Sequence, residues 1–415
     1  MKLKYDVEDR LPASQLAVYA IQWFVLTIAI VVTSVFVAPE AERLFFAQKL
    51  FAVMGVTGLI QVIWGHRLPI VAGPAAVLLV GVLSAGNADS NAIYSSIAIG
   101  GVLVTLLTFG GLMRYVQRLF TPRIIVVILM LIAFTLTPVI RGLVFPQGAD
   151  PGVHRFGLIF ALVGGMIMVI LNRRLKGVAK SLVTPLALVV GSIIYYAIFP
   201  VAEKIDSGGS ISDLIIDHFS IDLGVIVAFV ICYIALLIND IGSIESLGAM
   251  LQTKDMDRRL KRGVRITGVM NIVGGSMGVL GPVNYSMSPG VIASTGCAAR
   301  RALIPAAILL ILCSLSPDLI WILTSIPDPV IGAILLFLMG TQLAASLEMV
   351  HSTKSVQSFA DGLTIGLPLM IAMLCATMPD GIVPAIIDPL VGNGFAMGVI
   401  VVMIMEHIVN RNNKS

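Results

Sequence analysis

Five polar side chains interrupt an otherwise apolar stretch at 221–250, and they are the residues best suited to chemistry in this chain. They are Asn239, Asp240, Ser243, Glu245 and Ser246. A carboxylate in the middle of a hydrocarbon layer costs about 3 kcal/mol, so one that persists there is a candidate for solute binding or ion coupling. At about 100° per residue along a helix, Asn239, Ser243 and Ser246 share one face, Asp240 lies at its edge and Glu245 points about 120° away. We predict that Asn239 and Ser243 bind a solute and that Asp240 or Glu245 couples its movement to an ion. The alternatives are a structural hydrogen bond for Asp240 and a helix contact for Glu245.

Two apolar segments, 68–86 and 282–298, are interrupted near their starts by proline and glycine. A small residue precedes a proline in each, as Gly73-Pro74 and Ser288-Pro289. Short extended stretches should therefore lead into helices that begin at Pro74 and Pro289, because Gly and Ser are favoured N-caps and Pro the first helical position. Both helix starts should present free N–H groups to one central cavity suited to carbonyl oxygens or an anion. Continuous, proline-kinked helices are the alternative. The predicted lining adds six residues to Asn239 and Ser243: Ala72, Gly73, Asn284, Tyr285, Ser286 and Ser288.

Other polar residues in apolar surroundings are isolated. Gln22 is a lone amide for which substrate contact and helix–helix contact are both open. Asp328, between two prolines, is expected to cap a broken helix start. The five histidines, His66 included, fall in or beside loops, and none is expected to form a buried proton relay. The four cysteines are scattered singly without metal-ligand spacing, so we expect packing residues, no metal and no cofactor.

The composition requires a membrane environment. Of 415 residues, 58% are apolar and 12% are charged, whereas a soluble globular chain has about 25% charged residues. The net charge of +4 is spread over loops, so it does not predict a nucleic-acid partner. A phosphate loop, a dinucleotide fingerprint and a nucleophile elbow are all absent from the sequence, which argues against an enzyme and against transport driven by the chain's own ATP hydrolysis.

The predicted fold is an all-α polytopic membrane protein with fourteen crossings. Twelve ordinary apolar segments and the two interrupted ones make up this count, and one of the twelve is 318–347. Placing both termini in the cytoplasm leaves few Lys or Arg residues in the outer loops, as the positive-inside rule requires: Arg43, Lys49, Arg141, Arg155 and Lys204. An outer linker at 200–220 divides the chain into 1–199 and 221–415, with seven crossings each. Each half has its interrupted crossing, a short strand and a half-helix, in third position, which is typical of an inverted repeat.

A series of short motifs runs through the chain in a characteristic order. They are Tyr5-Asp6-Val7-Glu8-Asp9-Arg10-Leu11-Pro12, then Gln22, Arg67-Leu68-Pro69 with Gly73, Leu119-Phe120-Thr121-Pro122 and Ile326-Pro327-Asp328-Pro329-Val330-Ile331-Gly332. In this order the chain resembles the nucleobase/ascorbate transporter family, which includes bacterial uracil and xanthine permeases, over nearly its whole length.

The resemblance implies a core domain at 12–113 and 221–316 that moves against a gate domain at 121–199 and 318–409, usually in a homodimer. It also implies proton- or sodium-coupled uptake of a nucleobase across the cytoplasmic membrane. The site departs from the family pattern, because the two family glutamates are Asn239 and Met287 here and the family histidine after Gln22 is Trp23. Tyr285 and Gly290 match the family motif, and Ser288 replaces its asparagine.

The sequence thus predicts a secondary transporter for a nucleobase such as uracil or xanthine. A carrier of small anions on the same scaffold is the first alternative, since a site without glutamates no longer repels negative charge. An uncoupled channel or facilitator is the second.

Overall fold

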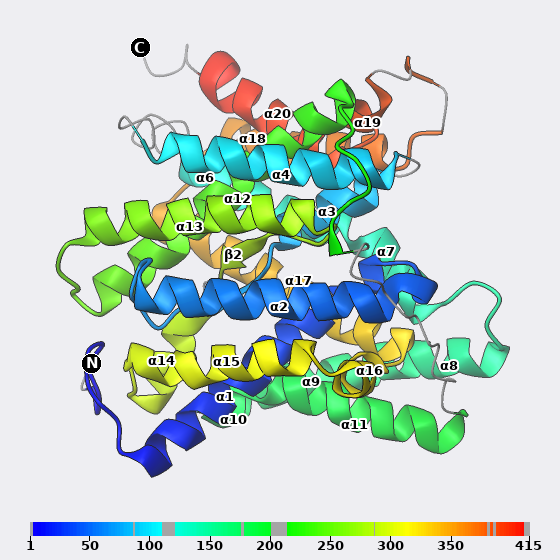
Figure 1. Cartoon of the computed structure of the whole chain (residues 1–415). Coiled ribbons are helices and arrows are strands. Elements are labelled where there is room, and N and C mark those ends of the chain that lie inside the picture. Colours follow the sequence, from blue (N-terminus) through cyan, green and yellow to red (C-terminus); the bar gives the residue numbers. More distant parts are fainter. Residues whose placement is uncertain are drawn as a thin grey trace.

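The structure, a computed structural model, describes residues 3–85, 88–109, 121–175, 178–200, 214–285, 287–379, 382–384 and 387–410. Helices form almost all of it, and many of them run roughly side by side along one direction (Figure 1). Two short strands from distant parts of the sequence pair between them.

In the first half of the chain, long helices flank a strand that leads into a short helix. The elements are α1 (Ala13–Val32), η1 (Val35–Val37), η2 (Glu40–Glu42), α2 (Arg43–Ile63), β1 (Ala72–Pro74), α3 (Ala76–Ser84), α4 (Ser90–Leu107), α6 (Pro122–Thr135), α7 (Thr137–Val144), α8 (Pro151–Ile159), η3 (Phe160–Gly164), α9 (Gly165–Arg174), α10 (Val178–Ser181) and α11 (Val183–Ile198).

The second half begins with the same order of elements: two long helices, a strand with a short helix, and another long helix. The elements are α12 (Leu223–Met250), α13 (Met256–Ser276), β2 (Pro282–Asn284), α14 (Ser288–Thr295), η5 (Arg300–Ala302), α15 (Leu303–Ser314), α16 (Pro317–Thr324), α17 (Asp328–Thr353), α18 (Phe359–Ala376), α19 (Asp388–Val391), α20 (Gly394–Ile404) and η6 (Met405–Val409).

Small residues let pairs of helices from the two halves approach closely. A Cβ added at Gly268 of α13 would lie 2.7 Å from the backbone nitrogen of Thr105 in α4, and one added at Gly275 would lie 2.4 Å from that of Ala98. Likewise, a Cβ at Gly55 of α2 would lie 3.0 Å from the carbonyl oxygen of Ala307 in α15. Such contacts allow dense packing where hydrophobic burial alone cannot hold helices together. They fix α4 against α13 and α2 against α15.

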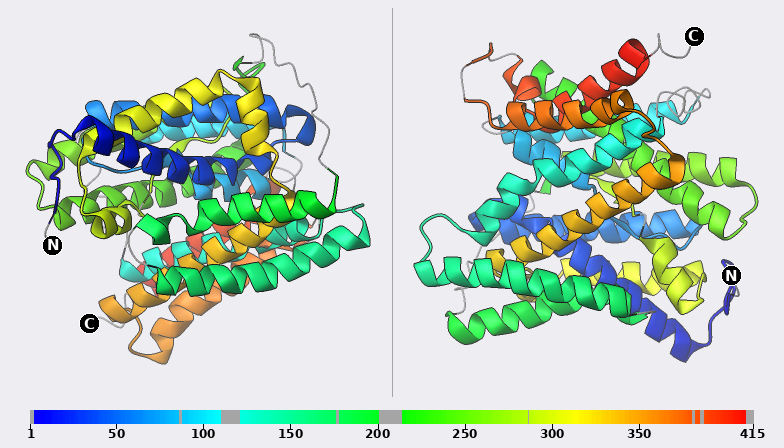
Figure 2. Two further views of the ribbon diagram at one scale, coloured as in Figure 1. Left: turned by 90° about the horizontal axis from the view of Figure 1, so that it is seen from below. Right: turned by 180° about the vertical axis from the view of Figure 1, so that it is seen from behind.

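A second set of helices packs around α17. This helix contacts α6, α7, η3, α9 and α11, while α18 and α20 contact α6 and one another. Figure 2 shows α17, in yellow-orange, running obliquely between α6 and the green pair α9 and α11.

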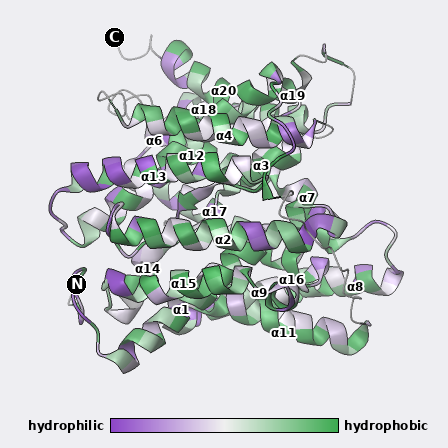
Figure 3. Cartoon of the chain, viewed as in Figure 1, coloured by the Kyte–Doolittle hydropathy of each residue, from purple (hydrophilic) through white to green (hydrophobic). Residues whose placement is uncertain are grey.

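The helices have the composition of membrane spans. Within the described residues, eight are long and apolar enough to cross a bilayer, or nine if the bent pair Arg300–Ser314 and Pro317–Thr324 is one span. The predicted count of fourteen is therefore not confirmed. Hydrophobic residues cover α9 and α11, and hydrophilic ones gather at one end of α13 (Figure 3). Exposed side chains on α9 and α11 include Met166, Val189 and Ile193, so this surface suits lipid.

Two local predictions were wrong, both at prolines. Pro74 does not begin a helix but lies in β1, and α3 begins at Ala76, because the strand pairing holds Pro74 extended. The segment 318–347 is not one span, since α16 ends at Thr324 and α17 begins at Asp328. Pro327 and Pro329 prevent the α16 helix from continuing, because proline has no N–H and restricts the residue before it. The predicted start near Pro289 is confirmed within one residue, as α14 begins at Ser288.

Candidate functional site

The two strands cross the interior as an antiparallel pair. Ala72 lies opposite Asn284, Gly73 opposite Val283, and Pro74 opposite Pro282. The pairing continues beyond the strands, because the Ala75 N–H donates to the Gly281 carbonyl at 3.0 Å. This pairing satisfies backbone groups that would otherwise be costly away from water. It brings the two interrupted segments together, as the sequence predicted.

Tyr285 and Ser288 tie the crossing segments to each other. The Tyr285 backbone N–H donates to the Val71 carbonyl at 2.9 Å, and its hydroxyl donates to the Pro74 carbonyl at 2.6 Å. The Ser288 hydroxyl accepts from the Val71 N–H at 3.1 Å and donates to the Tyr285 carbonyl at 3.2 Å. Gly73 is confined here, because an added Cβ would lie 2.9 Å from the Tyr285 ring.

Asp240 lies directly against this crossing. Its side chain is fully buried, and its Oδ1 accepts two hydrogen bonds from Asn284, from the backbone N–H at 2.9 Å and from Nδ2 at 2.8 Å. Its Oδ2 lacks a hydrogen bond of normal geometry among the described residues, although the Thr267 hydroxyl lies beside the carboxylate. A buried carboxylate with one satisfied and one unsatisfied oxygen can take up a proton without losing its existing bonds.

His66, which lies in the loop after α2 as expected, continues this network from a fully buried position. The residue has no solvent exposure. Its Nδ1 accepts from the Leu68 N–H at 3.0 Å, so its hydrogen must lie on Nε2, which donates to Asn284 Oδ1 at 3.1 Å. That bond orients the Asn284 amide so that its NH₂ group faces Asp240. The order is therefore fixed: His66 donates to Asn284, and Asn284 donates to Asp240.

A further set of buried polar residues surrounds the network, and sequence reasoning missed it. Asn271 of α13 donates to the Pro282 carbonyl at 2.8 Å and accepts from the Tyr233 hydroxyl at 2.7 Å. Gln61 of α2 donates to the Thr267 hydroxyl at 3.1 Å. The spacing of Thr267 and Asn271, one helical turn apart in an apolar stretch, is the signal that could have identified them. These bonds connect α2, α12 and α13 to β2.

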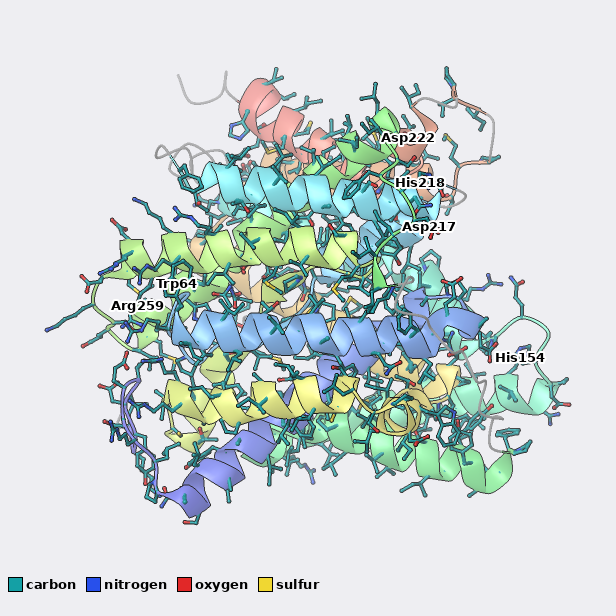
Figure 4. All side chains as sticks on the ribbon, in the orientation of Figure 1. Trp64, His154, Asp217, His218, Asp222 and Arg259 are labelled. Carbon is teal, nitrogen blue, oxygen red and sulfur yellow. The ribbon has the colours of Figure 1, made fainter. Side chains whose placement is uncertain are left out.

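Charged residues close one end of this region. The Arg259 guanidinium donates to the carbonyls of His66 and Arg67 at 3.1 and 2.8 Å. Glu8 lies 2.7 Å from Arg300, 3.7 Å from Arg259 and 3.8 Å from Arg67. The Arg300 hydrogen bond and the nearby arginines lower the pKa of Glu8. Figure 4 places Arg259 near Trp64 at this end of α2. We call Glu8, Arg67, Arg259 and Arg300 the Glu8 cluster.

The remaining predicted residues lie at different places. Asn239 is half-buried on α12, and the buried Ser243 donates to its carbonyl at 2.7 Å, whereas Glu245 is exposed. Ser286 lies outside the described residues. Gln22 is buried, its Nε2 has no partner within the described residues, and it lines a crevice of about 690 Å³ between α1 and α11 away from the strands.

A small cavity within the described residues reaches the strands. It has a volume of about 20 Å³ between α1, α2, β1 and α15, and Val71 and Ala72 are among its lining residues. That space is enough for about one water molecule, not for a larger solute.

Apolar helices of membrane-spanning length around a buried, hydrogen-bonded carboxylate are typical of polytopic membrane transport proteins. A family model described as "Permease family" matches residues 14–381, and the chain belongs to this family of nucleobase permeases.

Similar proteins agree with this assignment. The xanthine permease of Bacillus subtilis is 24% identical over 87% of this chain and 84% of its own length. A uric acid permease of the same organism is 23% identical over 83% of this chain and 80% of its own length. The transmembrane domain of a cyanobacterial bicarbonate transporter has a TM-score of 0.66 at 15% identity, covering 96% of this chain and all of that domain. The murine anion transporter Slc26a9 has a TM-score of 0.58 at 14% identity, covering 96% of this chain and 68% of its own. At such identities the two structures show a shared fold.

Proposed function

We propose that this protein carries a nucleobase across the cytoplasmic membrane by cation symport, with Asp240 as the residue that binds the coupling cation. The observation that carries the proposal is the buried network of Asp240, Asn284 and His66 at the strand crossing. The family membership and the relatives named for xanthine and uric acid support the substrate class. A buried carboxylate within a membrane protein is typical of ion-coupled transport.

The fourteen-crossing inverted repeat is part of this proposal. Helices α2 and α4 of the first half correspond in order to α13 and α15 of the second. A two-fold axis that relates the two halves would therefore map the contact between α4 and α13 onto the contact between α15 and α2. Segments that correspond under such a relation in the membrane plane run in opposite directions, and β1 and β2 are antiparallel.

The division into a core and a gate domain gives the proposed movement. Helices α1, α2, α4, α12, α13 and α15 surround the strands and form the core, whereas the helices around α17 form the gate. Substrate and cation would bind the core and cross the membrane as the core moves against the gate. Cytoplasmic termini remain a prediction of the positive-inside rule, and a homodimer remains a prediction of the family resemblance.

The proposed coupling ion is a proton. Protonation of Asp240 at Oδ2 removes a buried charge and leaves both hydrogen bonds from Asn284 to Oδ1 intact. His66 and Asn284 are positioning residues, because they orient the donors that face Asp240. Sodium is the alternative ion.

Substrate is proposed to bind at Asn239 and Ser243, beside the strand crossing on α12. A neutral amide can donate to and accept from a base at once, which suits the loss of the family glutamate at this position. Asn284, Tyr285 and Ser288 hold the crossing together through their hydrogen bonds. They would therefore shape this site and not supply its principal polar contacts.

Uptake into proteoliposomes tests the substrate class. We expect uptake of labelled xanthine that unlabelled uric acid or uracil inhibits and that sulfate and bicarbonate do not. Uptake of sulfate or bicarbonate without nucleobase uptake would replace this function with the anion alternative. Asn239→Ala should abolish nucleobase binding, whereas Glu245→Gln, a matched change on the exposed side of α12, should retain it. Wild-type affinity in Asn239→Ala would remove Asn239 from the site.

A further inference from the structure

A polar cavity lies at the opposite end of α2 from the Glu8 cluster. Its volume is about 370 Å³, within the range of small-molecule sites. It lies where the start of α2 meets the loop before α8, the end of α11, α16 and the start of α17, at the right in Figure 1. Residues from the proposed core and from the proposed gate line it together. Its principal lining side chains are Arg43, Asp150, Tyr195, Tyr196, Trp321 and Asp328.

Arg43 supplies this cavity with an incompletely satisfied cation. Its Nη1 lies 3.5 Å from Asp328 Oδ1, which is a long contact for an ion pair. Its Nε is shielded from solvent and has no hydrogen-bond partner among the described residues. A buried donor without an acceptor is costly. The Arg43 side chain is 26% exposed, and its planar guanidinium favours a planar, oxygen-bearing ligand.

Aromatic side chains form the facing wall. The Tyr196 hydroxyl donates to the Ser325 carbonyl at 3.1 Å, which fixes its position. Tyr195 packs edge-on against Phe156 and Tyr196, with ring centroids 5.2 and 5.4 Å away. Trp321 of α16 adds a third ring. Fixed aromatic rings offer large, rigid surfaces on which a flat heterocycle can stack.

We propose that this cavity is a second binding site, for a planar heterocycle with ring carbonyl and ring N–H groups. A ring carbonyl accepts from the exposed part of the Arg43 guanidinium, and a ring N–H donates to the Asp328 carboxylate. The ring stacks on one of the aromatic faces of Tyr195, Tyr196 or Trp321, since the Tyr195 and Tyr196 rings are nearly perpendicular. The proposal rests on the proposed function in one respect, because the transported nucleobase has this chemistry and is the expected occupant.

Trp321 fluorescence in the full-length protein in detergent tests this site, with xanthine as the probe. We expect a saturable component of the quenching by xanthine that is lost in Trp321→Phe. Trp64 remains as an internal reference, whereas Trp23, which lines the small cavity at the strands, reports on the proposed substrate site. Arg43→Gln should weaken the affinity at least tenfold, and Arg43→Lys should weaken it too, because lysine keeps the charge but loses the planar fork. Arg141→Gln, a change in α7 outside the cavity lining, should leave the affinity unchanged.

Three outcomes would overturn the inference. They are quenching by xanthine that persists unchanged in Arg43→Gln, quenching that Trp321→Phe retains in full, and quenching by sulfate as strong as that by xanthine, which would indicate an anion site. Thermal unfolding of each variant shows that it is folded.

Xanthine exchange in proteoliposomes separates this inference from the proposed function. If the wild-type protein exchanges xanthine but Arg43→Gln is quenched by xanthine as strongly as wild type, only the second site is refuted. Lack of wild-type exchange would refute the proposed function, and the quenching experiment would still decide whether the cavity binds xanthine.

Discussion

Two polar regions of this protein are built in different ways. The network at Asp240 is fully buried, has hydrogen bonds of 2.8 to 3.1 Å and joins α12, β2 and the loop after α2. The junction at Arg43 and Asp328 is half-buried, has one contact of 3.5 Å and joins α2 to α17. A tightly bonded, buried network resists rearrangement, whereas a weak, partly solvated ion pair can open at little cost. The first region thus suits a rigid site, and the second suits a surface that separates during transport.

The largest expected effect on stability follows from Asn284→Leu. This change removes one donor to Asp240 and the acceptor of His66, so two buried groups lose partners. We expect a loss of about 3–5 kcal/mol in the free energy of unfolding, together with a loss of uptake. Chemical unfolding in detergent measures it. The double variant with Asp240→Leu should recover part of the loss, and a single variant as stable as wild type would contradict the network.

His66→Phe should have a smaller effect. It leaves the Asn284 amide without its orienting donor but keeps the backbone N–H bond to Asp240. We expect about 1–3 kcal/mol of destabilisation and weaker proton-driven accumulation. His66→Gln, whose amide can also donate, should restore part of both. Proton-driven accumulation and chemical unfolding are measured on both variants. Equal defects in His66→Phe and His66→Gln would exclude a role for His66 in orienting Asn284.

Several features of the fold followed from the sequence because they depend on local patterns. The helical stretches, the two interrupted segments that meet in the interior and packing positions for Cys232, Cys297 and Cys313 were predicted and are present, whereas the pairing of the two strands was not predicted. His66 was not among the predicted site residues, because its burial depends on β2 and α13, which are distant in sequence. Proline effects were misjudged where pairing decided the conformation, as at Pro74 in the strand.

Glu8→Gln should cost about 1 kcal/mol near neutral pH, because the Glu8 side chain is 51% exposed and solvent screens its contacts with the arginines. The Arg300 hydrogen bond and the arginine charges lower the folded-state pKa of Glu8. Its contribution to stability is therefore present above the usual glutamate pKa and is lost as the pH falls through the lowered value. Unfolding curves of wild type and variant should converge in acid. A stability difference independent of pH would contradict this origin.

Asp328→Asn at the Arg43 junction should have the smallest effect on stability, about 0.5 kcal/mol or less, since partly exposed ion pairs contribute little. Its effect should appear in the rate of substrate exchange, because α2 and α17 lose the charge pair that joins them. Thermal unfolding and counterflow rates on the same preparation test this contrast. A large loss of stability would show that the junction is as rigid as the Asp240 network.

Proton coupling through Asp240 is the central claim, and one comparison tests it directly. Asp240→Asn is reconstituted in proteoliposomes, and xanthine counterflow is measured beside xanthine accumulation driven by an imposed inward proton gradient. The wild type should show both activities, and the variant should keep counterflow while losing accumulation, because asparagine keeps an acceptor for Asn284 but takes up no proton. Accumulation by the variant at the wild-type level would contradict the assignment of Asp240 as the coupling residue.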